Sequence, residues 1–600
     1  MKLSYSIFTY ICIALASYAA LSLSHAADQG SADTRQPNVL LILTDDQGYG
    51  DLSLHGNPQL RTPAMDRLGR QSLRLDRFYV NPVCGPTRAS LLTGRYHLRT
   101  GASGVTRRQE VLNPEEVTIA ELLQENGYAT ACFGKWHNGS VYPETPNGQG
   151  FDEFLGILGG LSQLYFDPIL NHNGEAKQYK GYITEILAEA SIQWMEQQIE
   201  SDKPFFCYVP FNAPHTPGLV EDQYWKTYYD KRIGRWEAVT YGMIKVIDQE
   251  VGRMLDFLES KNQADNTIVI FMSDNGPATW RYNAGLRGKK GHVFDGGIRV
   301  PCFIRWPSKL EPNTIKSPLA HIDILPTLAD WCRIPQTSSL ELDGLSFAEL
   351  SENPNATLPD RNLIAFTHGD RERVSSSGSV HNNRWSAVQR NGDWSLYDIK
   401  SDIRQINDLS KTHPDALQEL KAHFEATLST MPPLGLIAPY PLRDNGRGPV
   451  ILEAQDALLP KQYKGKGIDY NFPAGFSHHW ISSWTDANAV PEWKLDVIDP
   501  GKFEVTLRYC VKERDLGVAG HLIVQDKRLP ISITEAFDPP STPQPFLLEG
   551  EAKKYEHKTW KDLRLGSVSL ERGSTTLRIQ ITDIPGKEAM EIKDVVIARL

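Results

Sequence analysis

Two apolar runs along the chain each end in a pair of acidic or amide residues. The first is NVLLILT at residues 38–44, and the second is NTIVIFMS at residues 266–273. Unbroken apolar runs of this length are typical of strands that are buried on both faces of a parallel sheet. Polar sites in such sheets gather at the carboxyl ends of the strands, so we expect the two pairs to lie there. They are Asp45 with Asp46, and Asp274 with Asn275.

Amphipathic segments separate the two expected strands. Their apolar residues recur every three to four positions, as they do on one face of a helix. Strands that alternate with such helices predict an α/β domain in which helices cover both faces of a mostly parallel sheet. We assign this domain to residues 36–360. The expected helices lie at residues 63–72, 117–127, 183–200 and 238–261.

The pattern changes after residue 360. Residues 384–400 alternate as two paired strands do, and residues 413–429 have helical periodicity. We therefore expect a small α+β subdomain over residues 361–430. A segment rich in proline and glycine follows at residues 431–449 and predicts a linker.

Residues 450–600 are dominated by alternating apolar and polar positions, with turn signals such as DPGK and ERGS. This repetition is typical of antiparallel strands that bury one face. We predict a separate C-terminal β-sandwich. Its inward-facing side chains include Val505, Leu507, Tyr509 and Val511 from one strand, and Leu577, Ile579 and Ile581 from another.

Residues 1–26 have the features of a secretory signal peptide. Lys2 precedes an apolar run, and the small residues Ser24 and Ala26 indicate a cleavage site. An uncleaved anchor helix is the alternative interpretation. No later segment is long and apolar enough to span a membrane. We therefore expect an exported protein, periplasmic or secreted, without a membrane anchor.

Charge and cysteine content restrict the classes of partner. The formal net charge of −10 at pH 7 argues against a nucleic-acid-binding protein. It does not exclude an anionic substrate, since a site needs only local positive charge. The seven cysteines are scattered singly, without CxxC or Cys/His zinc spacing, so neither a disulfide scaffold nor a zinc site is expected.

One cysteine has unusual neighbours, in VCGPTRASLLTGR at residues 83–95. Pro86 is a good residue for the first turn of a helix, so Cys84 would lie at a helix N-terminus. Arg88 would follow about one turn later on the same side. Backbone N–H groups, the helix dipole and a guanidinium then converge at a spot that suits sulfate or phosphate. For an isolated cysteine, a buried structural role would be the expectation.

The two pairs at the strand ends would supply hard oxygen ligands for Ca²⁺ or, less readily, Mg²⁺. Taken separately, each pair is better explained as an Asx turn or a helix cap. Because both pairs follow buried strands, a shared metal site is favoured.

Further basic and imidazole groups lie in polar segments rich in glycine or proline. Any one of them could be a solvated loop residue. They are Lys135 and His137 in FGKWHNG, His215 in NAPHTP, and Lys290 in LRGKKGHVFDGGIRVP. Asn138 heads a glycosylation sequon in the first of these segments, where a glycan would obstruct the site, so we expect a bacterial protein.

Taken together, these motifs resemble those of the type I sulfatases, formylglycine-dependent arylsulfatase-like enzymes of the alkaline-phosphatase-like superfamily. Cys84-x-Pro86-x-Arg88 is similar to the family signature, although Gly85 stands where many relatives have serine. Family-like motifs run in order from about residue 36 to 335, and LYDIKSDIRQINDLSKTHPDAL resembles the C-terminal subdomain of the family. The other motifs are LILTDDQGYGDL, TPAMDRL, TGRY, ELLQENGYATACFGKWH, APHTP, SDNG, RGKKG and GGIRVP.

The resemblance implies that Cys84 is oxidised to Cα-formylglycine by a separate maturation enzyme that recognises CGPTR. The aldehyde hydrates to a geminal diol, one hydroxyl attacks sulfur, and the other lets sulfate leave as the aldehyde re-forms. The resemblance also implies one Ca²⁺ per chain that binds the nucleophilic oxygen and a sulfate oxygen. Its ligands would be Asp45, Asp46, Asp274, Asn275 and the modified Cys84.

Roles for the other residues follow from the same resemblance. Arg88, Lys135 and Lys290 would hold the sulfate. His137 would be the base that helps the bound sulfate leave, and His215 would be the acid that protonates the leaving alcohol. Lys290 is preferred to Lys289 because it matches the lysine before glycine in the RGxKG pattern of the family.

The expected substrate is a sulfated carbohydrate or an aryl sulfate, and a sulfated glycan is favoured. A phosphonate monoester or phosphodiester hydrolase is the alternative within the superfamily, and an inactive protein that binds sulfated glycans is the alternative of another class. The β-sandwich could contact carbohydrate through HHWISSW at residues 478–484, or it could be a structural support. Trp280 and Tyr282 are candidate residues at the substrate rim.

Overall fold

The computed structural model describes residues 35–600, except 230–232, 336–339, 354–355, 368–376, 434, 445, 447, 473–476, 543–544 and 547–554. The predicted signal peptide lies outside the described residues. The helices and strands belong to one compact unit, Asn38–Leu600. None of the described helices is long and apolar enough to cross a membrane.

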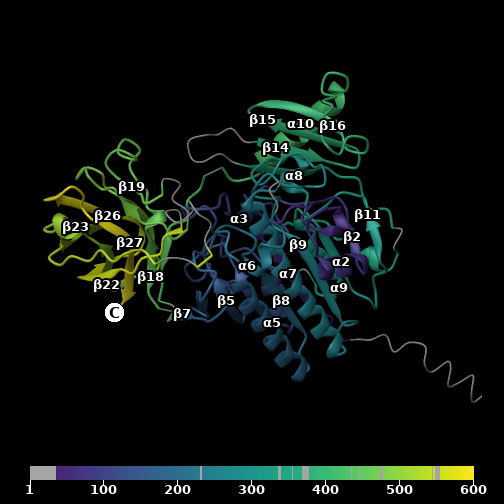
Figure 1. The fold of residues 1–600 in the computed structure, drawn as a ribbon. Helices are drawn as coiled ribbons and strands as arrows, with labels where there is room; N and C mark the ends of the chain where they lie inside the picture. Colours follow the sequence, from purple (N-terminus) through teal and green to yellow (C-terminus); the bar gives the residue numbers. More distant parts are fainter. Residues whose placement is uncertain are drawn as a thin grey trace, which may run out of the picture. The chain divides into compact units, whose positions relative to one another are not determined.

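A ten-stranded sheet forms the centre of the α/β domain, in the order β11-β2-β10-β9-β1-β8-β4-β5-β6-β7. Six of its strands, β2, β5, β7, β8, β9 and β11, are labelled in Figure 1. The five strands from β9 to β5 in this order are mutually parallel, so their carboxyl ends share one edge of the sheet. Antiparallel pairs flank them on both sides. The mostly parallel sheet predicted from the sequence is thus confirmed. The strands are β1 (Asn38–Thr44), β2 (Leu73–Leu75), β4 (Ala129–Lys135), β5 (Glu153–Ile157), β6 (Ile169–His172), β7 (Glu175–Gln178), β8 (Phe205–Pro210), β9 (Thr267–Ser273), β10 (Cys302–Arg305) and β11 (Asn313–Ile315).

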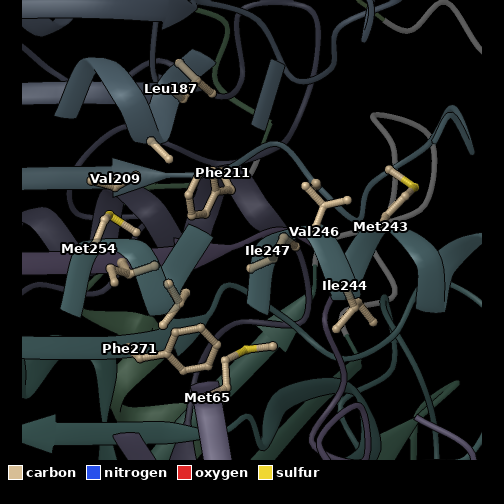
Figure 2. Close-up of a cluster of buried hydrophobic side chains, with 14 of the residues drawn as sticks. Met65, Leu187, Val209, Phe211, Met243, Ile244, Val246, Ile247, Met254 and Phe271 are labelled. Atoms are coloured by element: carbon tan, nitrogen blue, oxygen red, sulfur yellow. The ribbon is translucent and has the colours of Figure 1, made fainter. Parts of the chain in front are cut away.

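Helices cover both faces of this sheet. Successive residues of β1 point to opposite sides, so each face of the strand packs against its own set of helices. Leu40 and Ile42 pack in one cluster with α2 (Pro63–Arg70), α5 (Ile183–Glu200) and α7 (Arg235–Ser260). Figure 2 shows this cluster, in which side chains of α7 meet those of β8 and β9. Burying each large apolar side chain contributes roughly 1.5–3 kcal/mol. The alternate residues of β1 pack on the other face against α3 (Cys84–Thr93), α4 (Ile119–Glu125) and α9 (Ile324–Trp331).

Short elements complete this part of the chain. The small strands β3 and β12 pair in parallel, and two one-turn helices lie in the loops near the strand ends. Their bounds are β3 (Phe78–Tyr79), β12 (Leu319–Ala320), α6 (Asp222–Trp225) and α8 (Asp295–Ile298).

Four antiparallel strands and one helix form the expected α+β region. The strands follow one another in sheet order, and α10 packs on them through Leu420 and Phe424. The elements are β13 (Leu363–Thr367), β14 (Ser377–His381), β15 (Trp385–Arg390), β16 (Asp393–Asp398) and α10 (Pro414–Ser429). The paired strands and the helix therefore agree with the sequence pattern.

The C-terminal part contains two largely antiparallel sheets that share one apolar core. The alternating residues predicted to face inward, from Val505 to Val511 and from Leu577 to Ile581, are buried in it. Residues 431–449, expected to be a linker, contain β17, which pairs with β21. The strands are β17 (Tyr440–Leu442), β18 (Val450–Glu453), β19 (Asp469–Tyr470), β20 (Ile481–Ser482), β21 (Glu492–Val497), β22 (Gly501–Cys510), β23 (Ala519–Val524), β24 (Lys527–Ser532), β25 (Lys561–Leu570), β26 (Gly573–Asp583) and β27 (Glu591–Arg599).

Two aromatic residues considered for carbohydrate contact belong to this core instead. Trp480 and Trp484 of HHWISSW are 2% and 0% exposed. A buried indole cannot present its face to a sugar. Of the two interpretations left open for this segment, its two tryptophans fit the structural one.

Candidate active site

The acidic pairs meet at the carboxyl edge of the central sheet. Thr44 of β1 is paired with Ser273 of β9, so the residues that follow each strand start at the same level. Asp46 adopts a left-handed conformation with φ 68°, and its amide donates to Asp274 Oδ1 at 3.2 Å. Asn275 Nδ2 donates to Asp46 Oδ1 at 2.7 Å. All four side chains are buried, so the two loops form one preorganised acidic cluster.

Three cations surround this cluster. Arg88 donates to Asp274 Oδ2 at 2.9 and 3.1 Å and to the carbonyl of Lys135 at 2.6 Å. Lys135, the last residue of β4, places Nζ 2.6 Å from Asp45 Oδ2. Lys290 Nζ lies 2.6 Å from Asp46 Oδ1. Three positive side chains therefore match three carboxylates within one buried site.

Cys84 is the first residue of α3, as its neighbours in the sequence predict. It is 3% exposed, and all ten residues of the helix are buried. Its Sγ lies within 4.8 Å of carboxylate oxygens of Asp45 and Asp274, and Lys290 Nζ lies 3.9 Å away. The cysteine is therefore not a remote packing residue but part of the charged cluster.

The donor set fits a hard cation. Asp45 Oδ1 and Asn275 Oδ1 are buried and have no hydrogen-bond partner among the described residues. Leaving buried polar atoms unpaired costs about 1–3 kcal/mol each, so such atoms need a ligand. Carboxylate and amide oxygens are the ligands that Ca²⁺ prefers. Asp45, Asp46, Asp274 and Asn275 could therefore hold Ca²⁺.

The two histidines of the site have different tautomers. His137 Nε2 lies 2.8 Å from the carbonyl of Val105, which can only accept, so the proton is on Nε2 and Nδ1 keeps its lone pair. His215 Nδ1 lies 2.8 Å from the carbonyl of Thr216, which leaves Nε2 free, 3.7 Å from Asp46 Oδ2. Burial, with nearby Lys135, lowers the pKa of His137 well below its usual range. Both rings therefore lie at the site with one nitrogen available.

Burial and neighbouring charges shift the pKa values of the three carboxyl groups in different directions. Burial raises the pKa of Asp274 to about 6, and the charge of Asp45 adds to this effect. Burial likewise raises the pKa of Asp45, although Lys135 opposes it. Burial alone would also raise the pKa of Asp46, but Lys290 and His215 hold it below its usual range. A divalent cation would relieve the unfavourable charge on Asp45 and Asp274.

Two residues whose structural roles were not predicted from the sequence hold the site from a distance. Asn138 Nδ2 donates to the carbonyl of Gly85 at 3.1 Å and so supports the turn after Cys84. Its position directly after GKWH could have indicated this. Ser477 Oγ accepts from the amide of Gly160 at 2.9 Å, and a Cβ on Gly160 would meet Nε2 of His137 at 2.5 Å. Because 317 residues separate Ser477 from Gly160, no local pattern could reveal this contact.

Comparison with known proteins agrees with this site. Residues 37–334 match the family model described as Sulfatase, and residues 287–432 match one described as N-sulphoglucosamine sulphohydrolase, C-terminal. Human arylsulfatase A is 32% identical over 471 residues, which cover 67% of this chain and 89% of that protein. This chain belongs to the sulfatase family. It is an enzyme that hydrolyses sulfate esters, as the motifs implied.

Other sulfatases cover the same part of the chain. The N-acetylglucosamine-6-O-sulfatase of Bacteroides thetaiotaomicron is 25% identical over 65% of this chain and 86% of that protein. A crystal structure described as Ps i-CgsB in complex with k-i-k-neocarrahexaose is 30% identical, with a TM-score of 0.61 over 66% of this chain and 93% of that one. Neither family model extends past residue 432, so β18 to β27 lie outside both.

One solved structure with another activity shares the fold. The phosphonate monoester hydrolase of Agrobacterium radiobacter is 21% identical, with a TM-score of 0.51 over 66% of this chain and 95% of that one. At this identity the likeness concerns the fold alone. It agrees with the predicted alkaline-phosphatase-like architecture.

Proposed function

We propose that this sulfatase removes a sulfate ester from a sulfated glycan, using a formylglycine made from Cys84 and one bound Ca²⁺. The observation that carries the proposal is the position of Cys84. Its side chain lies at a helix N-terminus among three carboxylates and three cations, with two oxygen atoms left without partners. The support for a glycan comes from the 30%-identical structure with a bound neocarrahexaose and from the N-acetylglucosamine-6-O-sulfatase.

In this proposal Cys84 Sγ occupies the position of the nucleophilic oxygen of formylglycine. Bound Ca²⁺ would supply positive charge that lowers the pKa of that oxygen and neutralises a sulfate oxygen. Asp45, Asp46, Asp274 and Asn275 would hold it through oxygen atoms. Asp274 Oδ2 also accepts two hydrogen bonds from Arg88, which fixes the guanidinium at the same place.

Arg88, Lys135 and Lys290 would hold the sulfate group and stabilise the charge that develops in the transition state. Their preorganisation favours this role, because Arg88 and Lys135 are fully buried. Lys290 lies on the same segment as Lys289, but only Lys290 extends to Asp46 and Cys84. Lys289 Nζ instead donates to the carbonyl of Ala278. This difference supports the preference for Lys290.

His137 would accept a proton through Nδ1, because its Nε2 is committed to a carbonyl. His215 would donate a proton through Nε2 to the leaving alcohol. Burial and the charge of Lys290 lower the pKa of His215 to about 3, so it is neutral in the free site at pH 7. The negative charge of a bound sulfate ester would raise this pKa and help His215 to take up a proton.

Export and maturation complete the proposal. The signal-like residues 1–26 support a periplasmic or secreted location. A formylglycine-generating or sulfatase-maturing enzyme is the required partner. The domain limits proposed from the sequence remain 36–360, 361–430 and 450–600.

The peptide FYVNPVCGPTR, residues 78–88, provides the direct test of the modification. In protein from the native host we expect its mass to correspond to an aldehyde in place of the Cys84 thiol. Mass spectrometry of a tryptic digest measures this. An unmodified thiol in all of the purified protein would remove the proposed nucleophile and favour a protein that only binds sulfated glycans.

Hydrolysis of an aryl sulfate and an aryl phosphodiester by the matured protein separates the two enzyme classes. We expect kcat/KM for the sulfate to exceed that for the phosphodiester by at least about 100-fold, which corresponds to roughly 3 kcal/mol of preference in the transition state. Steady-state rates at equal pH and Ca²⁺ measure the ratio. The reverse preference would assign the protein to the phosphodiester or phosphonate hydrolases of the superfamily.

A further inference from the structure

Trp280 is an exposed aromatic residue on a firmly held loop beside the active site. Its exposure of 68% is the highest of any large hydrophobic side chain in the described part of the chain. The side chain of the next residue, Arg281, is enclosed; it binds Asp51 at 2.6 Å and donates to the carbonyl of Asp46 at 2.9 Å. Tyr282 donates to the carbonyl of His55 at 3.2 Å. The loop therefore presents an indole to solvent without needing to rearrange.

Two basic side chains flank this indole. Lys289 Nζ lies 6.0 Å from the centre of the Trp280 ring, and it donates to the carbonyl of Ala278 at 3.1 Å. The ring of His292 lies 5.7 Å from the indole at an angle of 66°. The contacts are those of a cation and an edge-on ring against an aromatic face. Together they fix the direction of Trp280.

Further positive charge surrounds the same spot. The pKa of His292 is lowered by burial and by the charges of Lys289, Arg390 and Arg287, so three cations lie within electrostatic reach of this ring. Arg287 donates to the hydroxyl of Tyr397 at 3.2 Å and to the carbonyl of Gln405 at 2.7 Å, so it contributes charge here rather than a free donor. In a chain with a net charge of −10, this positive charge is a local feature rather than a general property.

This group is continuous with the reaction centre. Lys289 and Lys290 are adjacent, so their Cα atoms are about 3.8 Å apart. Lys290 extends to Asp46 and Cys84, while Lys289 extends to the Trp280 loop. The backbone amide of Lys290 donates to the carbonyl of Pro277 at 3.0 Å, which ties the two loops together. Two neighbouring lysines therefore connect the reaction centre to the Trp280 loop.

We propose that Trp280, Lys289 and His292 form a subsite for a second anionic sugar of the substrate. The inference rests on the proposed glycan sulfatase function and specifies its substrate. Trp280 would pack against the apolar face of the sugar ring, and Lys289 would bind its sulfate or carboxylate group. The favoured substrate is then a glycan with negative charge on at least two neighbouring sugars, rather than an isolated sulfate ester.

Binding to protein that cannot turn over tests the subsite directly. The probe is persulfated maltohexaose, in which every sugar is anionic, and the host is full-length protein carrying Cys84→Ala. We expect Trp280→Ala and Lys289→Ala each to raise the Kd of the probe about tenfold, a loss of the size known for cation and aromatic contacts. Trp280→Tyr, which keeps an aromatic face, should recover most of the affinity. Isothermal titration calorimetry measures these values.

Lys203→Ala is the matched control. Lys203 is an exposed lysine between α5 and β8, at the amino edge of the parallel strands and thus opposite the active site. Its replacement also removes one positive charge, so it separates a local contact from a general effect of net charge. The Kd of the probe for this variant should stay within twofold of its Kd for the host protein.

Kinetics then separates failure of the subsite from failure of the function. In matured protein, Trp280→Ala and Lys289→Ala should reduce kcat/KM, mainly through KM, more for a polysulfated oligosaccharide than for an aryl sulfate. If the wild-type matured protein released sulfate from none of the esters, the proposed function would be refuted. Normal sulfate release, with the same Kd for the probe in the Trp280 and Lys289 variants as in the host, would refute the subsite alone. Absence of probe binding by the host would refute it as well.

Discussion

Replacing Cys84 by alanine should reduce sulfate release by about 10⁴-fold or more in matured protein. The variant lacks the side chain from which the proposed nucleophile is made, and loss of a nucleophile from a preorganised site typically costs 10⁴–10⁶ in kcat. The rest of the charged cluster should still bind sulfate esters, because Arg88 and Lys135 keep their partners Asp274 and Asp45. Steady-state release of sulfate from an aryl sulfate measures the effect.

Cys302→Ala provides the matched control for this experiment. Cys302 is also a buried thiol, 1% exposed, but it belongs to β10 and to the apolar cluster on one face of the sheet. Its removal should cost some stability through a small cavity, with turnover within about threefold of wild type. Comparable activity in Cys84→Ala and wild type would show that the chemistry does not depend on this residue.

Removing Ca²⁺ should lower the melting temperature, and the loss should grow as the pH is raised from 4.5 to 7.5. Burial raises the pKa of Asp274 to about 6, above the value near 4 of an unfolded aspartate. Between these values the metal-free folded state binds more protons than the unfolded state, so its stability falls as the pH rises. Above about pH 6 the full penalty is present, on the order of 3 kcal/mol for this group.

Ca²⁺ should offset this penalty, because it replaces the proton as the partner of the carboxylates. The shift in melting temperature on adding Ca²⁺ should therefore be several degrees at pH 7.5 and close to zero at pH 4.5. Asp46 does not reverse the trend, since its lowered pKa affects stability only below about pH 4. Differential scanning calorimetry with and without a chelator measures the shift at each pH.

Two aspartate variants check that the shift arises at the proposed site. Asp45→Asn should lose most of the Ca²⁺-dependent shift, because Asp45 supplies a buried oxygen that lacks another partner. Asp256→Asn removes an exposed carboxylate on α7 that pairs with Arg67 and should keep the full shift. An equal shift in both variants, or a shift that grows toward acid pH, would contradict this metal site.

The fold was predictable where local pattern decides it. The apolar runs that became β1 and β9 are buried on both faces, and the segment predicted at 183–200 coincides with α5. The limits of α7 were less predictable: the helix begins at Arg235, three residues before the predicted start, and only Trp236 is apolar among those three residues. The strand β17 was not predicted because it lies in a segment rich in proline and glycine. It has only three residues and pairs with β21.

The residue types of the site could be predicted from the sequence, but the hydrogen bonds that these residues make were less predictable. Strand ends indicated the two acidic pairs, and Pro86 indicated the helix at Cys84. The choice between Lys289 and Lys290 depended on family resemblance, because both are lysines in the same loop. The tautomers of His137 and His215 could not be predicted, since each is set by a backbone carbonyl that only the folded chain supplies.

The burial of α3 determines whether the proposed modification of Cys84 comes before or after folding. Every residue from Cys84 to Thr93 is enclosed, and Arg88 is bonded to Asp274 and to the backbone of Lys135. An enzyme that reads CGPTR must reach these side chains, which the folded state encloses. The proposed oxidation of Cys84 must therefore precede folding. A molecule that folds before Cys84 is oxidised would stay inactive. The fraction of active protein would then depend on the rate of modification relative to the rate of folding.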